Sequence, residues 1–416
     1  MDKQIYLCLA HMSKAGLEQK YVKEAFDTNW VVPLGPNVNA FEEDLKQFTG
    51  GTHEVVALSA GTAAVHLALI ACGVGPGDEV LVQSFTFCAS SHPITYLGAK
   101  PVFVGSEPET WNMDPVLLEE AIKDRIAKIG KKPKAIVPVA LYGMPYDCKR
   151  IMEIADRYDI PVVEDAAEGF GSKFDGRILG TFGKFGVLSF NGNKMITTSG
   201  GGALVCQSVE DKNTVMWYAT QARDAYPYYQ HTAIGYNYRM SNICAGIGRG
   251  QMMVAQAHID HHKHVQALYE ELLREVKGVH IHRQPADPRY DSNFWLCTAT
   301  LDADVKVQGQ ENAYKEVIKT AVGGAVGVIK AVESATTDCQ PNDNVEALRV
   351  FMATNRIETR PVWKPMHKQP VYVDAVVYTN GVEEEIFKVG FCLPAGPWVT
   401  DEDVKYIVEK IKEAIL

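Results

Sequence analysis

No stretch of this sequence approaches the ~18 consecutive apolar residues that a membrane-spanning helix requires. Its first residues, Met-Asp-Lys-Gln-Ile-Tyr-Leu, also lack the apolar segment of a secretory signal peptide. We therefore expect a cytoplasmic protein that has no membrane partner.

Paired cysteine motifs and an excess of basic residues are absent too. The nine cysteines are scattered without Cys-x-x-Cys spacing, so they predict small buried side chains rather than a disulfide framework. The 41 basic and 51 acidic residues give a net charge of −10, which disfavours nucleic acid as a partner. Neither a Gly-x-Ser-x-Gly nor a Gly-x-x-x-x-Gly-Lys-[Ser/Thr] motif occurs, so serine hydrolases and P-loop proteins lack support.

What the sequence does contain is enough apolar material for two domains. The 416 residues are 46% hydrophobic and 22% charged, which is typical of a globular protein too long for one compact core. We expect a large α/β domain over residues 1–255 and a smaller C-terminal α+β domain over residues 256–416. A segment at about 305–343 has an unusual composition, with a glycine- and alanine-rich stretch followed by a polar one.

Short apolar runs alternate with helical patterns along the first half of the chain. Strands are expected at 79–82, 101–104, 135–139, 161–163 and 186–190, with helices at 115–129 and 148–158 among them. Later elements are expected as a long helix over 243–273, a strand over 295–301, a helix over 344–355 and a last helix over 400–416, capped by Thr400. The alternation predicts a mostly parallel sheet with helices on both faces.

Two charged residues follow buried strands in this pattern. Asp165 ends the run that includes Pro161–Val163, and Lys194 follows the run that ends at Phe190. Strand ends of this kind project into the crevice where α/β sheets bind ligands. An acid and an amine there suit pyridoxal phosphate, because the acid keeps the pyridine nitrogen protonated and the amine forms a Schiff base. As alternatives, Lys194 could be a solvated surface lysine and Asp165 a helix cap.

A phosphate site is predicted in the segment Leu58-Ser-Ala-Gly-Thr-Ala-Ala-Val-His-Leu. A helix that begins near Gly61 and Thr62 would present free N–H groups and the positive end of its dipole. An ordinary capped helix start remains the alternative for this segment taken alone.

Together these segments resemble one family, the DegT/DnrJ/EryC1/StrS sugar aminotransferases, which have the aspartate-aminotransferase fold (fold type I). The similarity runs in order through Ser-Ala-Gly-Thr-Ala-Ala-Val-His-Leu-Ala-Leu (59–69), Gly-Val-Gly-Pro-Gly-Asp-Glu-Val (73–80), Ser-Phe-Thr-Phe-Cys-Ala-Ser (84–90) and Leu-Tyr-Gly-Met-Pro-Tyr-Asp (141–147). It continues through Val-Glu-Asp-Ala-Ala-Glu-Gly-Phe-Gly-Ser (163–172), Ser-Phe-Asn-Gly-Asn-Lys (189–194), Gly-Tyr-Asn-Tyr-Arg-Met-Ser-Asn (235–242) and Arg-Pro-Val-Trp-Lys-Pro-Met-His-Lys-Gln-Pro-Val-Tyr (360–372). By comparison with the family, the segment at about 305–343 looks like an insertion in the smaller domain.

The resemblance implies a role for each matching residue at the cofactor. Lys194 would be the catalytic Schiff-base lysine, and Asp165 would pair with the pyridinium nitrogen. The other cofactor-binding residues that it implies are Gly61, Thr62, Phe87, Glu168, Ser189 and Asn237. Asn237 would reach the cofactor phosphate of a neighbouring subunit, so a homodimer with shared active sites is expected. Phe87 could equally be an ordinary core residue.

The substrate-side residues follow from the same resemblance. They are Arg239, Arg360, Trp363, Lys364 and His367, in segments that face the nucleotide sugar in relatives. The alternative is a loop that the prolines at 361 and 365 merely order.

The motif Ser-Phe-Asn-Gly-Asn-Lys and the segment Trp-Lys-Pro-Met-His look most like aminotransferases of the bacillosamine-pathway type. The expected reaction moves an amino group from L-glutamate to C4 of a UDP-linked 4-keto-6-deoxy sugar. A GDP-linked sugar, as in perosamine synthesis, is one alternative, and a non-enzymatic sugar-binding or regulatory relative is another. The presence of Lys194 speaks against the sugar 3-dehydratases of the same family, which carry histidine there.

A histidine-rich segment offers a different hypothesis. His258 and His262 lie four residues apart, as two zinc ligands on one helix would. The pattern places no third ligand, and the family uses no metal. We therefore expect a solvated helix face and no metal site.

Overall fold

The computed structural model describes residues 3–314 and 339–416. Most of the insertion expected at about 305–343 therefore lies outside the described residues. Among the described helices, none is long and apolar enough to cross a membrane.

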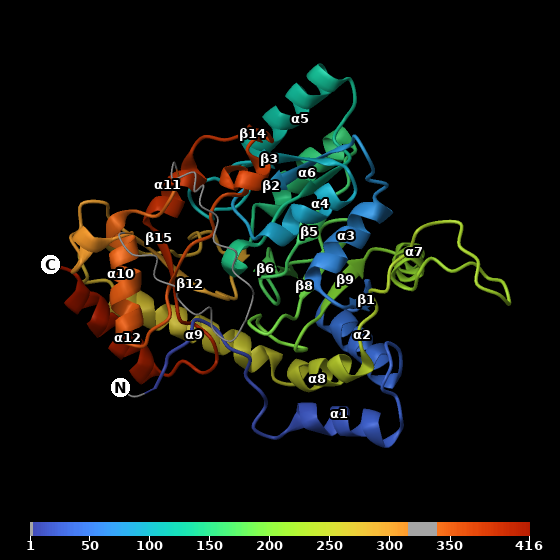
Figure 1. The fold of residues 1–416 in the computed structure, drawn as a ribbon, viewed down its shortest axis with the longest axis horizontal. Coiled ribbons are helices and arrows are strands. Elements are labelled where there is room, and N and C mark those ends of the chain that lie inside the picture. Colours follow the sequence, from blue (N-terminus) through green and yellow to red (C-terminus); the bar gives the residue numbers. More distant parts are fainter. Residues whose placement is uncertain (1–2, 315–338) are drawn as a thin grey trace.

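The site is built on a broad central sheet (Figure 1). Its strands are β1 (Glu54–Leu58), β2 (Glu79–Gln83), β3 (Lys100–Val104), β4 (Ala135–Val137), β5 (Val163–Asp165), β8 (Phe185–Ser189), β9 (Gly202–Cys206) and β14 (Val376–Tyr378). They form two four-stranded groups, β1-β9-β8-β5 and β14-β3-β2-β4, joined by parallel bridges between the β4 and β5 segments. β9 runs antiparallel to both of its neighbours, β1 and β8, and the other strand pairs of this sheet are parallel. The predicted mostly parallel sheet is confirmed.

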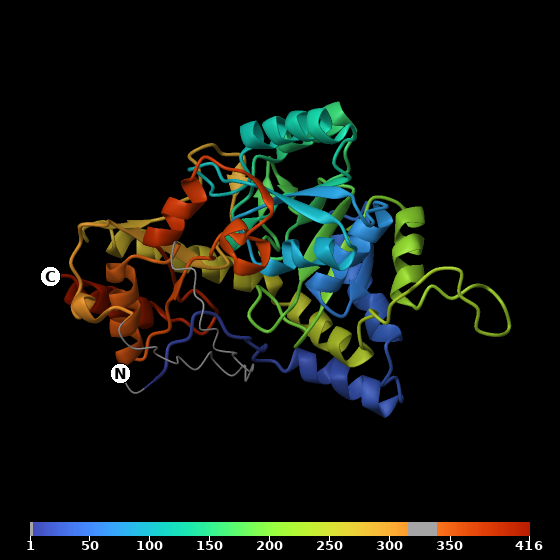
Figure 2. The same cartoon turned by 45° about the horizontal axis from the view of Figure 1, so that its top comes forward.

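Alternate side chains of these strands belong to two separate buried clusters, one on each face of the sheet. Leu81 of β2 belongs to one cluster, and Val80 and Val82 belong to the other. The first cluster includes side chains of α2 (Pro36–Phe48), α5 (Pro115–Ile129) and α6 (Cys148–Tyr158), and the second those of α3 (Gly61–Ala71), α4 (His92–Tyr96) and α7 (Val209–Ala219). Helices therefore cover both faces, as Figure 2 shows and as the sequence predicted.

Two of these helices have the predicted bounds because their ends are chemically marked. The Asp114 side chain accepts a hydrogen bond from the N–H of Val116 at the start of α5, and Gly130 ends that helix with a left-handed backbone. At the start of α6, the Asp147 side chain accepts the N–H of Arg150. Such caps satisfy donors that a helix start leaves free.

The C-terminal part builds a second sheet with its own core. Its antiparallel strands are β10 (Val279–Ile281), β12 (Cys297–Leu301), β15 (Gly390–Leu393) and β13 (Arg360–Pro361), in that order. The helices that pack on it are α9 (Ala255–Leu272), α10 (Asp343–Thr354) and α12 (Asp401–Ala414). Thr400 starts α12 in a capping box with Asp403, which confirms the predicted cap. The division of the chain near residue 255 stays a proposal.

Further elements lie outside these two sheets and the helices named so far. They are α1 (Leu17–Asp27), α8 (Asn242–Met252), α11 (Val382–Val389) and a sheet of β6 (Lys173–Phe174), β7 (Arg177–Ile178) and β11 (Tyr290–Asp291). After α7 the chain extends into a long loop that projects away from the rest of the molecule (Figures 1 and 2).

The expected long helix over residues 243–273 is wrong. The segment forms two helices, α8 and α9, with non-helical residues Met253 and Val254 between them. No proline or glycine marks this break, so tertiary packing rather than local sequence ends α8.

The solvated helix face expected around His258 is also wrong. His258 and His262 are buried on α9, and their Nδ1 atoms lie 3.2 Å from the carbonyl oxygens of Met195 and Phe294, respectively. Among the described residues, no group of three or more metal-ligating side chains comes together. The four-residue spacing therefore reflects a helix face that packs against backbone carbonyls.

Candidate active site

A cavity of about 460 Å³ opens at the edge of the sheet where β1, β2, β4, β5 and β8 end. The lining of this cavity includes seven of the expected cofactor residues: Gly61, Thr62, Phe87, Asp165, Glu168, Ser189 and Lys194. Trp363, which was expected at the substrate, also lines it. Segments from across the sequence meet here because the carboxyl ends of parallel strands share one edge of a sheet.

Lys194 extends into this cavity from the turn after β8, where its N–H bonds to the carbonyl of Asn191. Its Nζ atom lies 3.3 Å from Oε1 of Glu168 and 3.9 Å from the centre of the Trp295 ring. Only 13% of the Lys194 side chain is exposed, and Glu168 and Trp295 are buried. The amine is thus held between a carboxylate and an aromatic face.

Asp165 ends β5 beside this amine. Its carboxylate accepts the Ser90 hydroxyl at 2.7 Å and the N–H of Ala167 at 3.1 Å. Burial raises the pKa of Asp165, while these two hydrogen bonds and the charge of Lys194 act in the opposite direction. A cation close to the carboxylate would therefore stabilise its ionised form. A protonated pyridine nitrogen is such a cation, so Asp165 fits the cofactor's ring.

Another part of the cavity lining fits the cofactor's phosphate. Helix α3 begins at Gly61, and no side chain caps its start, which leaves its first N–H groups available to an anion. A Cβ atom on Gly61 would lie 3.1 Å from Cβ of Ser189 and 3.2 Å from its Oγ. This close approach brings the hydroxyl of Ser189 against the helix start, next to Thr62.

Aromatic rings form a further wall. Phe87 is 49% exposed, so it is not a core residue, and its ring centre lies 5.3 Å from that of Trp363. The buried ring of Tyr142 lies behind Trp363, with centres 6.2 Å apart and an angle of 16° between the ring planes. The wall presents flat apolar surfaces to a ligand.

The two arginines expected at the substrate lie outside the lining of this cavity. Arg239 donates to Oε1 of Glu42 at 2.5 Å and to the carbonyl of Ala57 at 2.9 Å, in a nearly buried ion pair. Arg360 pairs with Glu358 at 2.7 Å. Their assignment to the substrate stays a prediction, and both guanidinium groups have structural partners.

The remaining three expected residues also lie outside the lining. Nδ1 of His367 lies 2.6 Å from the Ser84 hydroxyl, and Nε2 of His367 lies 3.0 Å from Glu384. Lys364 is half-buried on the same segment, and Asn237 is exposed near the base of the projecting loop. The roles expected for them stay predictions.

Trp295 and Ser90 also line the cavity, although neither was predicted from the sequence. Trp295 lies two residues before the start of β12, and its indole N–H donates to the carbonyl of Asn193 at 2.7 Å. Ser90 belongs to a segment that carried the family resemblance, and that membership was the available signal. Nothing in the sequence around Trp295 distinguishes it from a core tryptophan.

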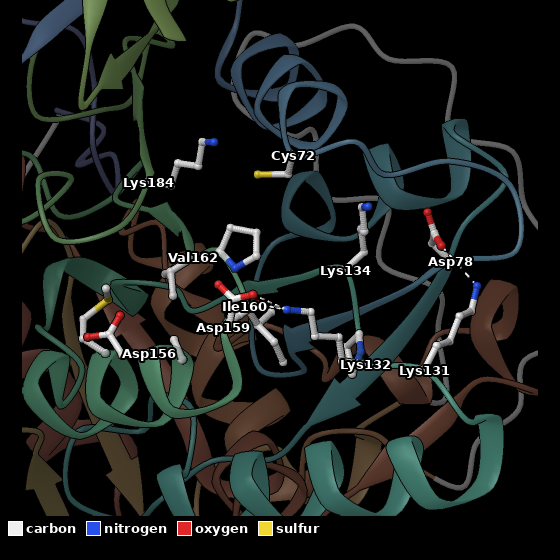
Figure 3. Close-up of a pocket in the computed structure, with 14 residues that line it drawn as sticks. Cys72, Asp78, Lys131, Lys132, Lys134, Asp156, Asp159, Ile160, Val162 and Lys184 are labelled. Atoms are coloured by element: carbon white, nitrogen blue, oxygen red, sulfur yellow. Dashed lines mark hydrogen bonds and ion pairs between the residues drawn. The ribbon is translucent and has the colours of Figure 1, made fainter. Parts of the chain in front are cut away.

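A second hollow, of about 690 Å³, lies at the amino ends of β2, β4, β5 and β8 (Figure 3). Its lining includes four lysines, and three of them pair with acids: Lys131 with Asp78, Lys132 with Asp159, and Lys184 with Asp211. None of the expected cofactor residues lines it. The seven expected cofactor residues that line a cavity all line the one at the carboxyl edge.

Comparison with known proteins gives concordant matches. The model of the DegT/DnrJ/EryC1/StrS aminotransferase family matches residues 13–333 and 310–412. The "Putative pyridoxal phosphate-dependent aminotransferase EpsN" of Bacillus subtilis (strain 168) is 41% identical over 413 residues, covering 98% of this chain and 95% of the relative. GDP-perosamine synthase of Escherichia coli O157:H7 is 34% identical over 410 residues, or 98% of each chain. A crystal structure of a DegT DnrJ EryC1 StrS aminotransferase from Brucella abortus superposes with a TM-score of 0.80 at 25% identity, covering 96% of this chain and 95% of that one.

Proposed function

This chain belongs to the DegT/DnrJ/EryC1/StrS aminotransferase family, and we propose that it transfers an amino group from L-glutamate to C4 of a UDP-linked 4-keto-6-deoxy sugar. Membership makes it an aminotransferase that depends on pyridoxal phosphate. The observation that carries the proposal is the convergence of Lys194, Asp165 and the uncapped start of α3 in one cavity.

When bound, pyridoxal phosphate supplies an aldehyde that condenses with amines and a ring that withdraws electrons. The start of α3 and the Ser189 hydroxyl bind the phosphate, and Asp165 holds the proton on the ring nitrogen. Nζ of Lys194 removes the proton from the α-carbon of glutamate and, in the second half-reaction, delivers a proton to C4 of the sugar. Glu168, 3.3 Å from Nζ, orients the amine for both transfers.

The choice of a UDP-linked sugar rests on the motifs at 189–194 and 363–367, and the flat aromatic wall suits a nucleotide base. A GDP-linked sugar is the second candidate, because a GDP-perosamine synthase is similar over 98% of each chain.

A homodimer that shares its active sites is also part of the proposal. Lys194 is the only basic side chain among the described residues that line the cavity, and the cavity also contains two carboxylates. A phosphate and a diphosphate need more donors than this, and a second copy of the chain can supply them. The projecting loop exposes Tyr226, Tyr228, Tyr229 and Ile234 and leads to Asn237, which suits contact with that copy.

The visible absorbance of the purified protein with pyridoxal phosphate tests the chemistry. We expect a band from cofactor linked to Lys194, its loss on adding L-glutamate, and its return on adding the keto sugar. Lys194→Ala should bind the cofactor without forming the linked band. A wild-type band that no amino donor changes would rule out transamination, and competition between UDP- and GDP-linked sugars distinguishes the two substrates.

A further inference from the structure

A strained turn lies directly behind the active-site cavity. It is the short helical turn Leu141–Gly143, whose central residue, Tyr142, has a left-handed backbone with φ 53° and ψ 18°. This conformation is disfavoured for any residue with a Cβ atom, and Tyr142 is also buried, with 4% of its surface exposed. Tyr142 is not part of the cavity lining. A backbone conformation of this kind persists where the surrounding contacts hold it in place.

One of those contacts leads to the catalytic lysine. The N–H of Tyr142 donates to Oε2 of Glu168 at 2.7 Å, and the other oxygen of this carboxylate, Oε1, lies 3.3 Å from Nζ of Lys194. Each oxygen of Glu168 therefore has one partner: the strained turn on one side and the amine on the other. A shift of the turn would rotate the carboxylate against Lys194.

A second contact leads to the aromatic wall. The Tyr142 hydroxyl accepts the backbone N–H of Trp363 at 2.7 Å, and the two rings lie nearly parallel. Trp363 itself lines the cavity and contacts Phe87. Tyr142 thus bonds the aromatic wall through its side chain and Glu168 through its backbone.

We propose that Tyr142 is a positioning residue that couples the Trp363 wall to Glu168 and, through Glu168, to Lys194. The inference rests on the proposed function, because it takes Trp363 as a surface on which the nucleotide packs. A nucleotide on this wall fixes the Trp363 segment, which fixes the Tyr142 hydroxyl and keeps Glu168 against the amine. Nucleotide and cofactor then bind with positive coupling, although neither contacts Tyr142.

The test measures the affinity of the protein for pyridoxal phosphate, with and without saturating UDP, and again with GDP. In the wild type we expect one of these nucleotides to tighten cofactor binding about fivefold, the effect of one net hydrogen bond. Tyr142→Phe removes the hydroxyl that accepts the Trp363 N–H but keeps the backbone N–H on Glu168. This variant should bind cofactor alone as the wild type does and lose the coupling.

Tyr146→Phe is the matched control, because Tyr146 is equally buried and its hydroxyl bonds neither Glu168 nor Trp363. It should keep the coupling. Glu168→Gln breaks the charged contact with Lys194 at the other end of the connection and should also abolish the coupling, even if Tyr142→Phe folds poorly. Wild-type coupling that survives in Tyr142→Phe or in Glu168→Gln would overturn the proposal, as would its absence from the wild type.

These outcomes can be separated from failure of the proposed function. Affinities are measured without turnover, so a wild type that carries out both half-reactions but shows no coupling removes only the role of Tyr142. A wild type that binds cofactor with coupling to the nucleotide, yet transfers no amino group, removes only the proposed reaction.

Discussion

Gly61→Ala tests whether the start of α3 is the phosphate cradle. The new Cβ atom would lie 3.1 Å from Cβ and 3.2 Å from Oγ of Ser189, and 3.7 Å from the carbonyl of Leu188. Because Ser189 ends a buried strand, α3 has to yield by a few tenths of an ångström. Overpacking of this kind costs about 1–3 kcal/mol, and alanine returns about 1 kcal/mol of helix propensity. The free energy of unfolding of the cofactor-free protein should therefore fall by only about 0–2 kcal/mol.

The helix propensity of alanine does not offset the loss of space for the phosphate, so the affinity for pyridoxal phosphate should fall more clearly than the stability does. We expect the dissociation constant of pyridoxal phosphate to rise about 5–30-fold, which corresponds to about 1–2 kcal/mol. Gly200→Ala is the control, because Gly200 also lines the cavity but has nothing within 4 Å of its would-be Cβ. Absorbance titration of both variants gives the comparison. If Gly61→Ala binds cofactor as tightly as Gly200→Ala does, the phosphate lies elsewhere.

Three further predictions concern stability. Burial lowers the pKa of His262 from 6.5 to about 3. Between pH 6.5 and 3 only the unfolded chain takes up this proton, so the free energy of unfolding should fall as the pH drops through that range. Urea unfolding of His262→Gln should show a weaker pH dependence. Arg239→Met leaves Glu42 buried without its cation and should cost about 3–5 kcal/mol in urea unfolding. If Arg239→Met unfolds like the wild type but binds the sugar more weakly, the expected role of Arg239 at the substrate would be favoured instead. Thr400→Ala removes the hydroxyl that accepts the N–H of Asp403 at the start of α12, and it should lower the free energy of unfolding by about 1 kcal/mol. Thr400→Ser keeps this hydroxyl and should unfold like the wild type.

Much of the fold could be predicted because its signals are local. Single residues, Asp114 and Asp147, cap α5 and α6, and an apolar run shows that a strand is buried. Such a run does not show the direction of the strand, so the antiparallel course of β9 had no signal. The break after Met252 and the burial of His258 are set by what packs against α8 and α9, and they could not be read from either helix alone.

The site divides in the same way. Asp165 and Lys194 were identified because each follows an apolar run, and the structure brings both to the edge where such runs end. Trp295 and Tyr142 were missed because their importance comes from contacts with residues far away in the sequence. A tryptophan before a strand has no local feature that indicates an active site, and the signal available for Tyr142 was its place in the segment 141–147 that carried the family resemblance.

The strand β14 has a consequence for the order in which the molecule is completed. It pairs Val376 with Val102 of β3, so the sheet gains its edge strand from a segment about 270 residues further along the chain. During synthesis, the edge of β3 stays open until residues 376–378 have left the ribosome. A nascent or truncated chain would present that open edge to other chains, where strand-to-strand aggregation is the hazard. Trp363 lies in the segment that leads to β14, so the aromatic wall is also completed late, and a chain that ends before Trp363 lacks part of the lining of the active-site cavity.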